Sequence, residues 1–112
     1  MTRTVLRDVS QFLAEGWCQN AHALDERGRK VESRDPSAES WCLAGAVLAS
    51  TSDEALRRAT FAALAEAIRA THPQVGGWRG GARAVCTGFN DVEGRTADEV
   101  LLVVAHALSL SR

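Results

Sequence analysis

Apolar residues recur every three or four positions in three stretches of the chain, which is the period of an amphipathic α-helix. The stretches are residues 4–15, 52–70 and 97–110. Thr4 can cap the first stretch, and Gly16 follows it as a helix end. His72 and Pro73 follow the second stretch, and the residue before a proline is pushed out of helical geometry. The pattern therefore predicts three amphipathic helices.

Two of these helices are preceded by a capping-box sequence. In such a box a Thr hydroxyl and a Glu carboxylate three residues later each accept a hydrogen bond from the other residue's backbone N–H. Thr51 with Glu54 precedes the second stretch, and Thr96 with Glu99 precedes the third. Both helix starts are therefore predicted from side-chain chemistry as well as from hydrophobic spacing.

A fourth stretch, residues 35–50, lacks a polar face. Asp35 can cap a helix, and Pro36 suits its first position because no N–H is needed there. From Trp41 to Ala49 every residue is apolar or glycine. A helix that is apolar all round packs against neighbours on several sides. We therefore predict a central helix over residues 35–50.

The remaining segments lack helical periodicity. Residues 25–28 carry a turn signal between 19–24 and 29–31, which indicates a short hairpin, whereas residues 75–91 are expected to be irregular. No repeat or linker divides the chain. The expected fold is mostly α (α+β): one domain over residues 1–112, with four helices, a central apolar helix and a small β-hairpin after the first helix.

Composition narrows the function classes. The formal net charge of −1 argues against nucleic-acid binding, and no apolar run approaches the roughly 20 residues of a membrane span. The three cysteines lie far apart without a Cys-x-x-Cys pair, so neither a zinc site nor a disulfide framework is expected. We expect a cytoplasmic protein with free thiols, and no metal or other cofactor.

Three short motifs give the chain a family resemblance. They are Gly16-Trp17-Cys18-Gln19, Trp41-Cys42-Leu43-Ala44-Gly45-Ala46, and Phe89-Asn90-Asp91 followed by Gly94-Arg95-Thr96. With the turn at Gly28 between the first two, the chain resembles a bacterial and phage family catalogued only as a domain of unknown function. The family pattern has tryptophan where this chain has Phe89. The resemblance implies one compact bacterial domain and no mechanism.

The most distinctive polar cluster is Asn90, Asp91 and Arg95, directly before the last predicted helix. Asp91 can serve as an acid, a base or a ligand anchor, and Arg95 with the helix N-terminus can hold an anion. In the alternative interpretation Asn90 and Asp91 stabilise a turn, and Arg95 pairs with Asp91 or Glu93. The sequence leaves both interpretations open.

A glycine-rich loop over residues 76–83 is the second candidate. Trp78, Arg79 and Arg83 offer an aromatic ring and two guanidinium groups, which suit an anionic or planar ligand. The loop lacks the Lys-Ser/Thr ending of a P-loop. A surface loop without a ligand is the alternative.

The cysteines are the third candidate. Cys18 and Cys86 lie beside less regular structure and could be nucleophiles, with His22, His72 or His106 as base. Cys42 lies in the apolar helix, where burial raises a thiol pKa. Free cysteine is otherwise a small buried hydrophobe.

These observations predict an accessory or binding domain that recognises a protein or a small anionic ligand. Arg79, Arg83 and Arg95 would neutralise charge, Trp78 would supply apolar contact, and Asp91 would fix orientation. The alternative is a small enzyme that uses Asp91 as acid or base, with Cys18 or Cys86 as a possible nucleophile. A homodimer built on leftover apolar helix faces is a third possibility.

Overall fold

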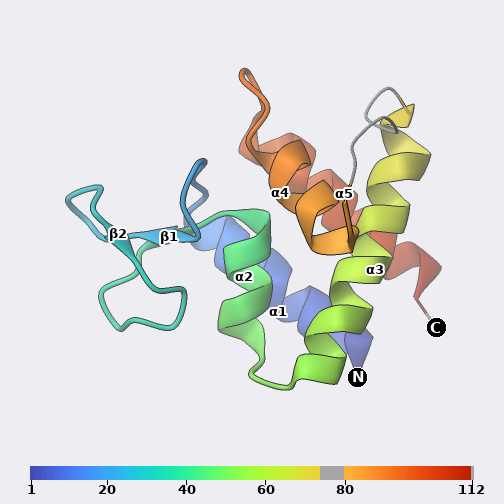
Figure 1. The fold of residues 1–112 in the computed structure, drawn as a ribbon, viewed down its shortest axis with the longest axis horizontal. Coiled ribbons are helices and arrows are strands. Elements are labelled where there is room, and N and C mark those ends of the chain that lie inside the picture. The colour runs from blue at the N-terminus through green and yellow to red at the C-terminus, as the bar shows by residue number, and fades with distance from the viewer. Residues whose placement is uncertain (74–79, 112) are drawn as a thin grey trace.

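The computed structural model describes residues 1–73 and 80–111, and this part of the chain forms five helices and a small sheet (Figure 1). In chain order these are α1 (Thr2–Glu15), β1 (Ala23–Leu24), β2 (Lys30–Val31), β3 (Ser40–Trp41), α2 (Leu43–Ser50), α3 (Glu54–Thr71), α4 (Ala82–Asn90) and α5 (Ala97–Leu110). A mostly helical α+β fold is therefore confirmed. The predicted number of four helices is wrong.

Helix α2 lies at the centre of the molecule and contacts α1, α3 and α4. Its first five residues, Leu43–Val47, are all buried. Small residues permit this packing: a methyl group at Gly45 would overlap the carbonyl oxygen of His22. The segment that precedes β1 can therefore lie directly against α2, and this contact forms one wall of the site described below.

The predicted start of the central helix at Asp35 is wrong. Asp35 forms a local turn instead, in which its Oδ1 accepts hydrogen bonds from the backbone N–H and the hydroxyl of Ser37. Such side-chain turns compete with helix formation. Ser40–Trp41 forms β3, and the helix begins only after Cys42, whose Sγ accepts a hydrogen bond from Gly45 N–H.

The predicted hairpin is confirmed, and the sheet has a third strand. Strand β1 lies in the middle and pairs antiparallel with β2 on one side and β3 on the other. The turn uses Asp25, which accepts hydrogen bonds from the backbone N–H groups of Arg27 and Arg29, and Gly28 at φ +76°. Strand β3 was hidden in the sequence because it lies at the start of the apolar run, inside the stretch predicted as helix.

The first residues of the helices show which of the predicted N-caps form. The Thr96–Glu99 capping box of α5 is confirmed. The Thr51–Glu54 box is wrong: Asp53 caps α3 by accepting from Leu56 N–H. The first helix begins at Thr2, before the expected cap at Thr4. None of the described helices combines the length and hydrophobicity that crossing a bilayer requires.

Helix α4 is the largest departure from the prediction, because residues 75–91 were expected to be irregular. Residues Ala82–Asn90 are helical, with Gly81 as N-cap. Val85, Cys86 and Phe89 are buried at helical spacing. The glycines around this short segment obscured its periodicity, and its position beside α2 and α3 determines the candidate site.

Candidate functional site

One face of α4 carries three polar side chains at intervals of four residues. Arg83, Thr87 and Asp91 follow one another along this face, since residues four apart are neighbours on a helix surface. The buried positions Val85 and Phe89 lie on the core-facing side of the same helix. The polar face is therefore available to line a surface pocket.

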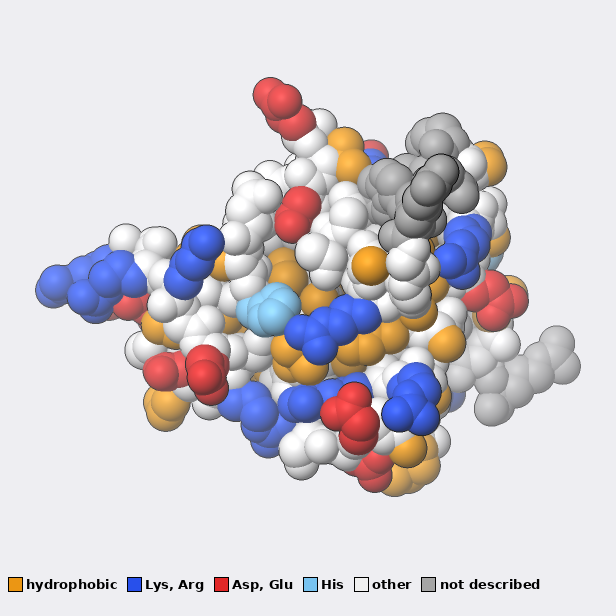
Figure 2. All heavy atoms as spheres, in the orientation of Figure 1, with side chains coloured by type: hydrophobic (Ala, Val, Ile, Leu, Met, Phe, Trp, Pro, Cys, Tyr) orange, Lys and Arg blue, Asp and Glu red, His pale blue; other side chains and the backbone are white. Residues whose placement is uncertain are grey.

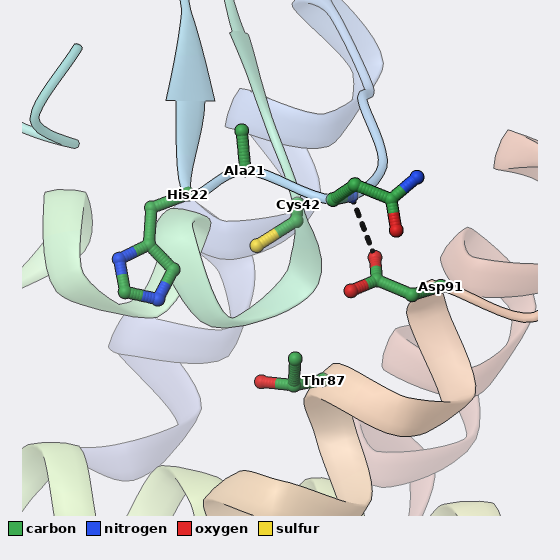
Figure 3. Close-up of a pocket in the computed structure, with 6 residues that line it drawn as sticks. Ala21, His22, Cys42, Thr87 and Asp91 are labelled. Atoms are coloured by element: carbon green, nitrogen blue, oxygen red, sulfur yellow. Dashed lines mark hydrogen bonds between the residues drawn. The ribbon is translucent and has the colours of Figure 1, made fainter. Parts of the chain in front are cut away.

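A pocket of about 400 Å³ lies between this face of α4, the start of α2 and the segment before β1. We call it the Asp91 pocket, and it is lined by Asn20, Ala21, His22, Cys42, Thr87 and Asp91. Figure 3 shows the Thr87 side chain from α4 and the Asp91 carboxylate just after α4 beside the same space as Cys42 and His22, while the Ala21 methyl group points away from that space. Its volume falls in the usual range of small-molecule sites.

Asp91 is held in place through one of its two carboxylate oxygens. Oδ1 accepts hydrogen bonds from Asn20 N–H and from Asn90 Nδ2, each at 2.9 Å. Asn20 directs its N–H at Asp91 from a left-handed backbone conformation, φ 64°, which asparagine tolerates. No described residue hydrogen-bonds to Oδ2, which lies on the pocket side (Figure 3). The carboxylate is fixed in orientation and keeps one oxygen for a ligand.

His22 lines the pocket and has Arg83 beside it. Arg83 Nη2 lies 3.5 Å from His22 Nε2. Burial lowers the pKa of His22, the positive charge of Arg83 lowers it further, and Asp91 partly opposes this change. The imidazole is therefore neutral at neutral pH and acts as a hydrogen-bonding group, while Arg83 supplies the positive charge.

Asn90 lies outside the pocket, buried behind Asp91. Its Oδ1 accepts hydrogen bonds from Trp17 Nε1 at 2.7 Å and from Leu43 N–H at 3.0 Å. Its Nδ2 donates to Cys18 O at 3.1 Å and to Asp91 Oδ1. We call these contacts the Asn90 network. They occupy the whole hydrogen-bonding capacity of the amide, so Asn90 has a structural role, but it joins distant segments of the chain and not the local turn that the structural interpretation expected.

The network also explains why the sequence motifs occur together. Trp17 and Cys18 belong to the first motif, Leu43 to the second and Asn90 to the third. The model of a protein family described as "Family of unknown function (DUF6197)" matches residues 1–109. The chain belongs to this family.

Membership of DUF6197 confirms the predicted resemblance to a domain of unknown function. It assigns no activity. A search of curated proteins and a search of solved structures each found no match. The chemistry of this DUF6197 domain has to be inferred from its own residues.

The three thiols of the DUF6197 domain are all in environments that disfavour the reactive thiolate. Burial raises the pKa of Cys18, that of Cys42 to about 11 and that of Cys86 to about 12. Cys86 is in the core, and Cys18 is buried beneath the pocket, where its Sγ points to Ala21 O at 3.6 Å. This geometry does not support either residue as a nucleophile.

Arg95 is not part of the pocket. Its guanidinium lies over the Phe89 ring, 3.9 Å from the centroid, and its Nε donates to Phe89 O. Its ion-pair partner is Glu99, at 3.3 Å. The expected pairing with Asp91 or Glu93 is therefore wrong, and Arg95 stabilises the turn between α4 and α5.

The glycine-rich loop can be assessed only in part. Trp78 and Arg79 lie outside the described residues, while Arg83 is on α4 and not on a loop. Asn20 and Thr87 were missed. The four-residue spacing of Arg83, Thr87 and Asp91 indicates a shared helix face, but only once residues 82–90 are known to be helical.

Residues 1–73 and 80–111 contain no cluster of three or more His, Cys, Asp or Glu side chains suited to a metal.

Proposed function

We propose that this domain binds a small anionic ligand in the Asp91 pocket. The ligand's anionic group faces Arg83, and its hydroxyl or amine donors face Asp91. One observation carries the proposal: a carboxylate fixed through Oδ1 presents Oδ2 to a pocket lined by His22, and Arg83 Nη2 lies 3.5 Å from His22 Nε2. Within the described part of the chain, Arg83 forms no ion pair.

Opposite charges at two sides of one pocket orient a ligand. A guanidinium binds carboxylate or phosphate oxygens, and a carboxylate accepts from ligand N–H or O–H groups. Thr87 and neutral His22 add hydrogen-bonding groups between these two ends. The result is a site that selects a ligand by the relative positions of its anion and its donors.

Thiol chemistry is not part of this proposal, because the pKa values of Cys18, Cys42 and Cys86 are raised. The pocket contains a positioned carboxylate and a neutral imidazole, which bind a ligand without any covalent step. A binding domain therefore needs fewer assumptions than an enzyme. A protein segment that places a carboxylate at Arg83 is the competing occupant.

The test is a thermal-shift screen with small carboxylates, sugar phosphates and nucleotides, followed by calorimetric titration. A ligand that binds only the native state raises the melting temperature by mass action. Asp91→Asn keeps an oxygen for Asn20 N–H and removes the charge, so it should weaken binding of a hit about tenfold or more. Glu93→Gln is the matched control, because it removes an exposed carboxylate two residues away.

The two variants separate a pocket ligand from a surface effect. Equal weakening by Glu93→Gln would indicate long-range charge and contradict the pocket. A panel in which no compound stabilises the wild type, combined with binding of an acidic peptide that depends on Arg83, would assign the site to a protein partner instead.

A further inference from the structure

A second hollow adjoins the Asp91 pocket at His22 and Arg83. It has a volume of about 310 Å³ and is lined by side chains from separate elements: His22, Glu32, Ser33, Arg34, Arg57 and Arg83. We call it the arginine hollow. Figure 2 shows the face that contains it, where Lys and Arg side chains (blue) lie around a histidine (pale blue) and apolar groups (orange).

Two of its three arginines are anchored at the C-terminal end of α2. Arg57 donates from Nε to Thr51 O at 2.7 Å and from Nη2 to Leu48 O at 2.9 Å. Arg34 donates from Nη1 to Leu48 O and Ala49 O, each at 3.4 Å. These bonds satisfy helix-end carbonyls and fix both guanidinium groups, whose remaining N–H groups stay available.

The positive charge of the three arginines in the hollow exceeds the negative charge of the groups around them. A helix C-terminus is equivalent to about half a negative charge. Glu32 adds one more, and none of Arg34, Arg57 and Arg83 forms an ion pair within residues 1–73 and 80–111. His22 is neutral at neutral pH. An excess of roughly one and a half positive charges therefore remains.

Ser33 supplies an independent observation. The residue is 8% exposed, and its Oγ is the one buried side-chain N or O atom in the described residues without a hydrogen-bond partner. Its backbone is held in place, because Ser33 O accepts from Trp41 Nε1 at 2.9 Å. A buried hydroxyl without a partner destabilises the folded state. Ser33 also lines a second hollow beside Trp41, so a ligand acceptor in the arginine hollow would remove that destabilisation once the hydroxyl turns toward it.

We propose that the arginine hollow binds a phosphate monoester group. Such a group carries about −1.5 to −2 charges and three acceptor oxygens, which matches the excess charge, the three arginines and the unpartnered Ser33 hydroxyl. A carboxylate has one charge and two oxygens, so it leaves part of the hollow unsatisfied. Because the hollow adjoins the Asp91 pocket, this deepens the proposed function: the ligand is a phosphorylated compound whose hydroxyl or amine groups reach Asp91.

The first experiment titrates the protein with inorganic phosphate near neutral pH, up to about 10 mM, and follows backbone and arginine side-chain resonances. Saturable shifts should occur at Ser33, Arg34 and Arg83. Arg34→Gln and Arg83→Gln should each weaken phosphate binding about tenfold. Arg58→Gln is the matched control, because it removes the same charge from α3 without lining the hollow.

Ser33→Ala separates a ligand contact from a structural role. Removing a buried hydroxyl that has no partner leaves the free protein as stable as before or more stable. The same change should weaken phosphate binding about threefold. Absence of saturable shifts in the wild type, or equal weakening by Arg58→Gln, would overturn the proposal. Unchanged affinity in both Arg34→Gln and Arg83→Gln would overturn it as well.

A second set of probes identifies the source of the phosphate. Glucosamine 6-phosphate carries hydroxyl and amine donors beside its phosphate, and a blocked pentapeptide with one phosphoserine carries the phosphate on a chain. Tighter binding of the sugar phosphate than of inorganic phosphate supports a small-molecule ligand, and tighter binding of the peptide overturns it. Asp91→Asn should weaken sugar-phosphate binding and leave inorganic phosphate binding unchanged. If inorganic phosphate binds but Asp91→Asn does not weaken sugar-phosphate binding, the proposed function of the Asp91 pocket is refuted while the phosphate site in the arginine hollow stands.

Discussion

Asn90 and Asp91 are neighbours in the chain, yet their side chains have opposite surroundings. All hydrogen-bonding groups of the Asn90 side chain have partners, which come from two distant parts of the chain and from the adjacent Asp91, and the residue is fully buried. Asp91 uses one oxygen within the protein and presents the other to a pocket. The difference shows that two adjacent polar residues can have different roles in the structure: Asn90 joins distant segments of the fold, and Asp91 lines a pocket.

The largest expected effect comes from breaking the Asn90 network. Asn90→Leu leaves the Trp17 indole N–H, Leu43 N–H and Cys18 carbonyl without partners in a buried site. The variant should lose about 3–5 kcal/mol of unfolding free energy. This loss is measured by urea denaturation, with circular dichroism as the probe of unfolding. A loss below about 1 kcal/mol would mean that the network does not stabilise the fold.

A smaller loss is expected from Gly45→Ala, which disturbs the wall shared by the core and the Asp91 pocket. The added methyl group overlaps His22 O, so either α2 or the segment before β1 must move. Destabilisation of about 1–3 kcal/mol is expected, together with weaker ligand binding. Ala46→Gly is a helix control that removes a methyl group from the same helix without adding an overlap. Wild-type stability in Gly45→Ala would show that this contact is loose.

Asp91→Asn sharpens the comparison because it should change binding and not folding. The amide keeps one oxygen for Asn20 N–H, so unfolding free energy should change by no more than about 1 kcal/mol. Thermal unfolding with and without a bound ligand distinguishes the two effects. If Asp91→Asn destabilised the protein as much as Asn90→Leu, both residues would be structural and the pocket assignment would be wrong.

The smallest effect concerns the pH dependence of stability through His22. Its folded pKa lies below the usual 6.5, so the folded state binds fewer protons than the unfolded state between these values. The stability that His22 contributes is present above about pH 6.5 and is lost as the pH falls through the folded pKa. Arg83→Gln should raise the His22 pKa, measured by histidine resonances during a pH titration. A lower pKa in this variant would contradict the contact.

The sequence predicted elements well where one local signal dominated. The Thr96–Glu99 box, the turn at Gly28 and the stop at Pro73 each depend on neighbouring residues alone, and each is found in the structure. The start of α2 at Leu43 was not predicted, because the cap signal at Asp35 and the apolar run from Trp41 were assigned to one helix. In the structure Asp35 forms its own turn, and pairing with β1 draws Ser40–Trp41 into a strand.

The candidate site was only partly predictable for a different reason. Asp91 and Arg83 were identified from residue type, but their neighbours Asn20 and Thr87 were not, because the pocket joins residues separated by about two thirds of the chain. Arg34, Arg57 and Ser33 were also missed. Their significance lies in a shared hollow and in an unpartnered hydroxyl, neither of which leaves a pattern in the sequence.

The span of the Asn90 network has a consequence for how the domain folds. Asn90 bonds to Trp17 and Cys18, which precede it by 73 and 72 residues, and to Leu43, 47 residues away. Contacts of such long sequence separation close large loops and form at a late stage, after local helices. Because Asp91 is held by the same contacts, the pocket assembles only when the whole chain has folded. A fragment that lacks residues 1–20 or 80–91 would lack residues of the network and of the pocket.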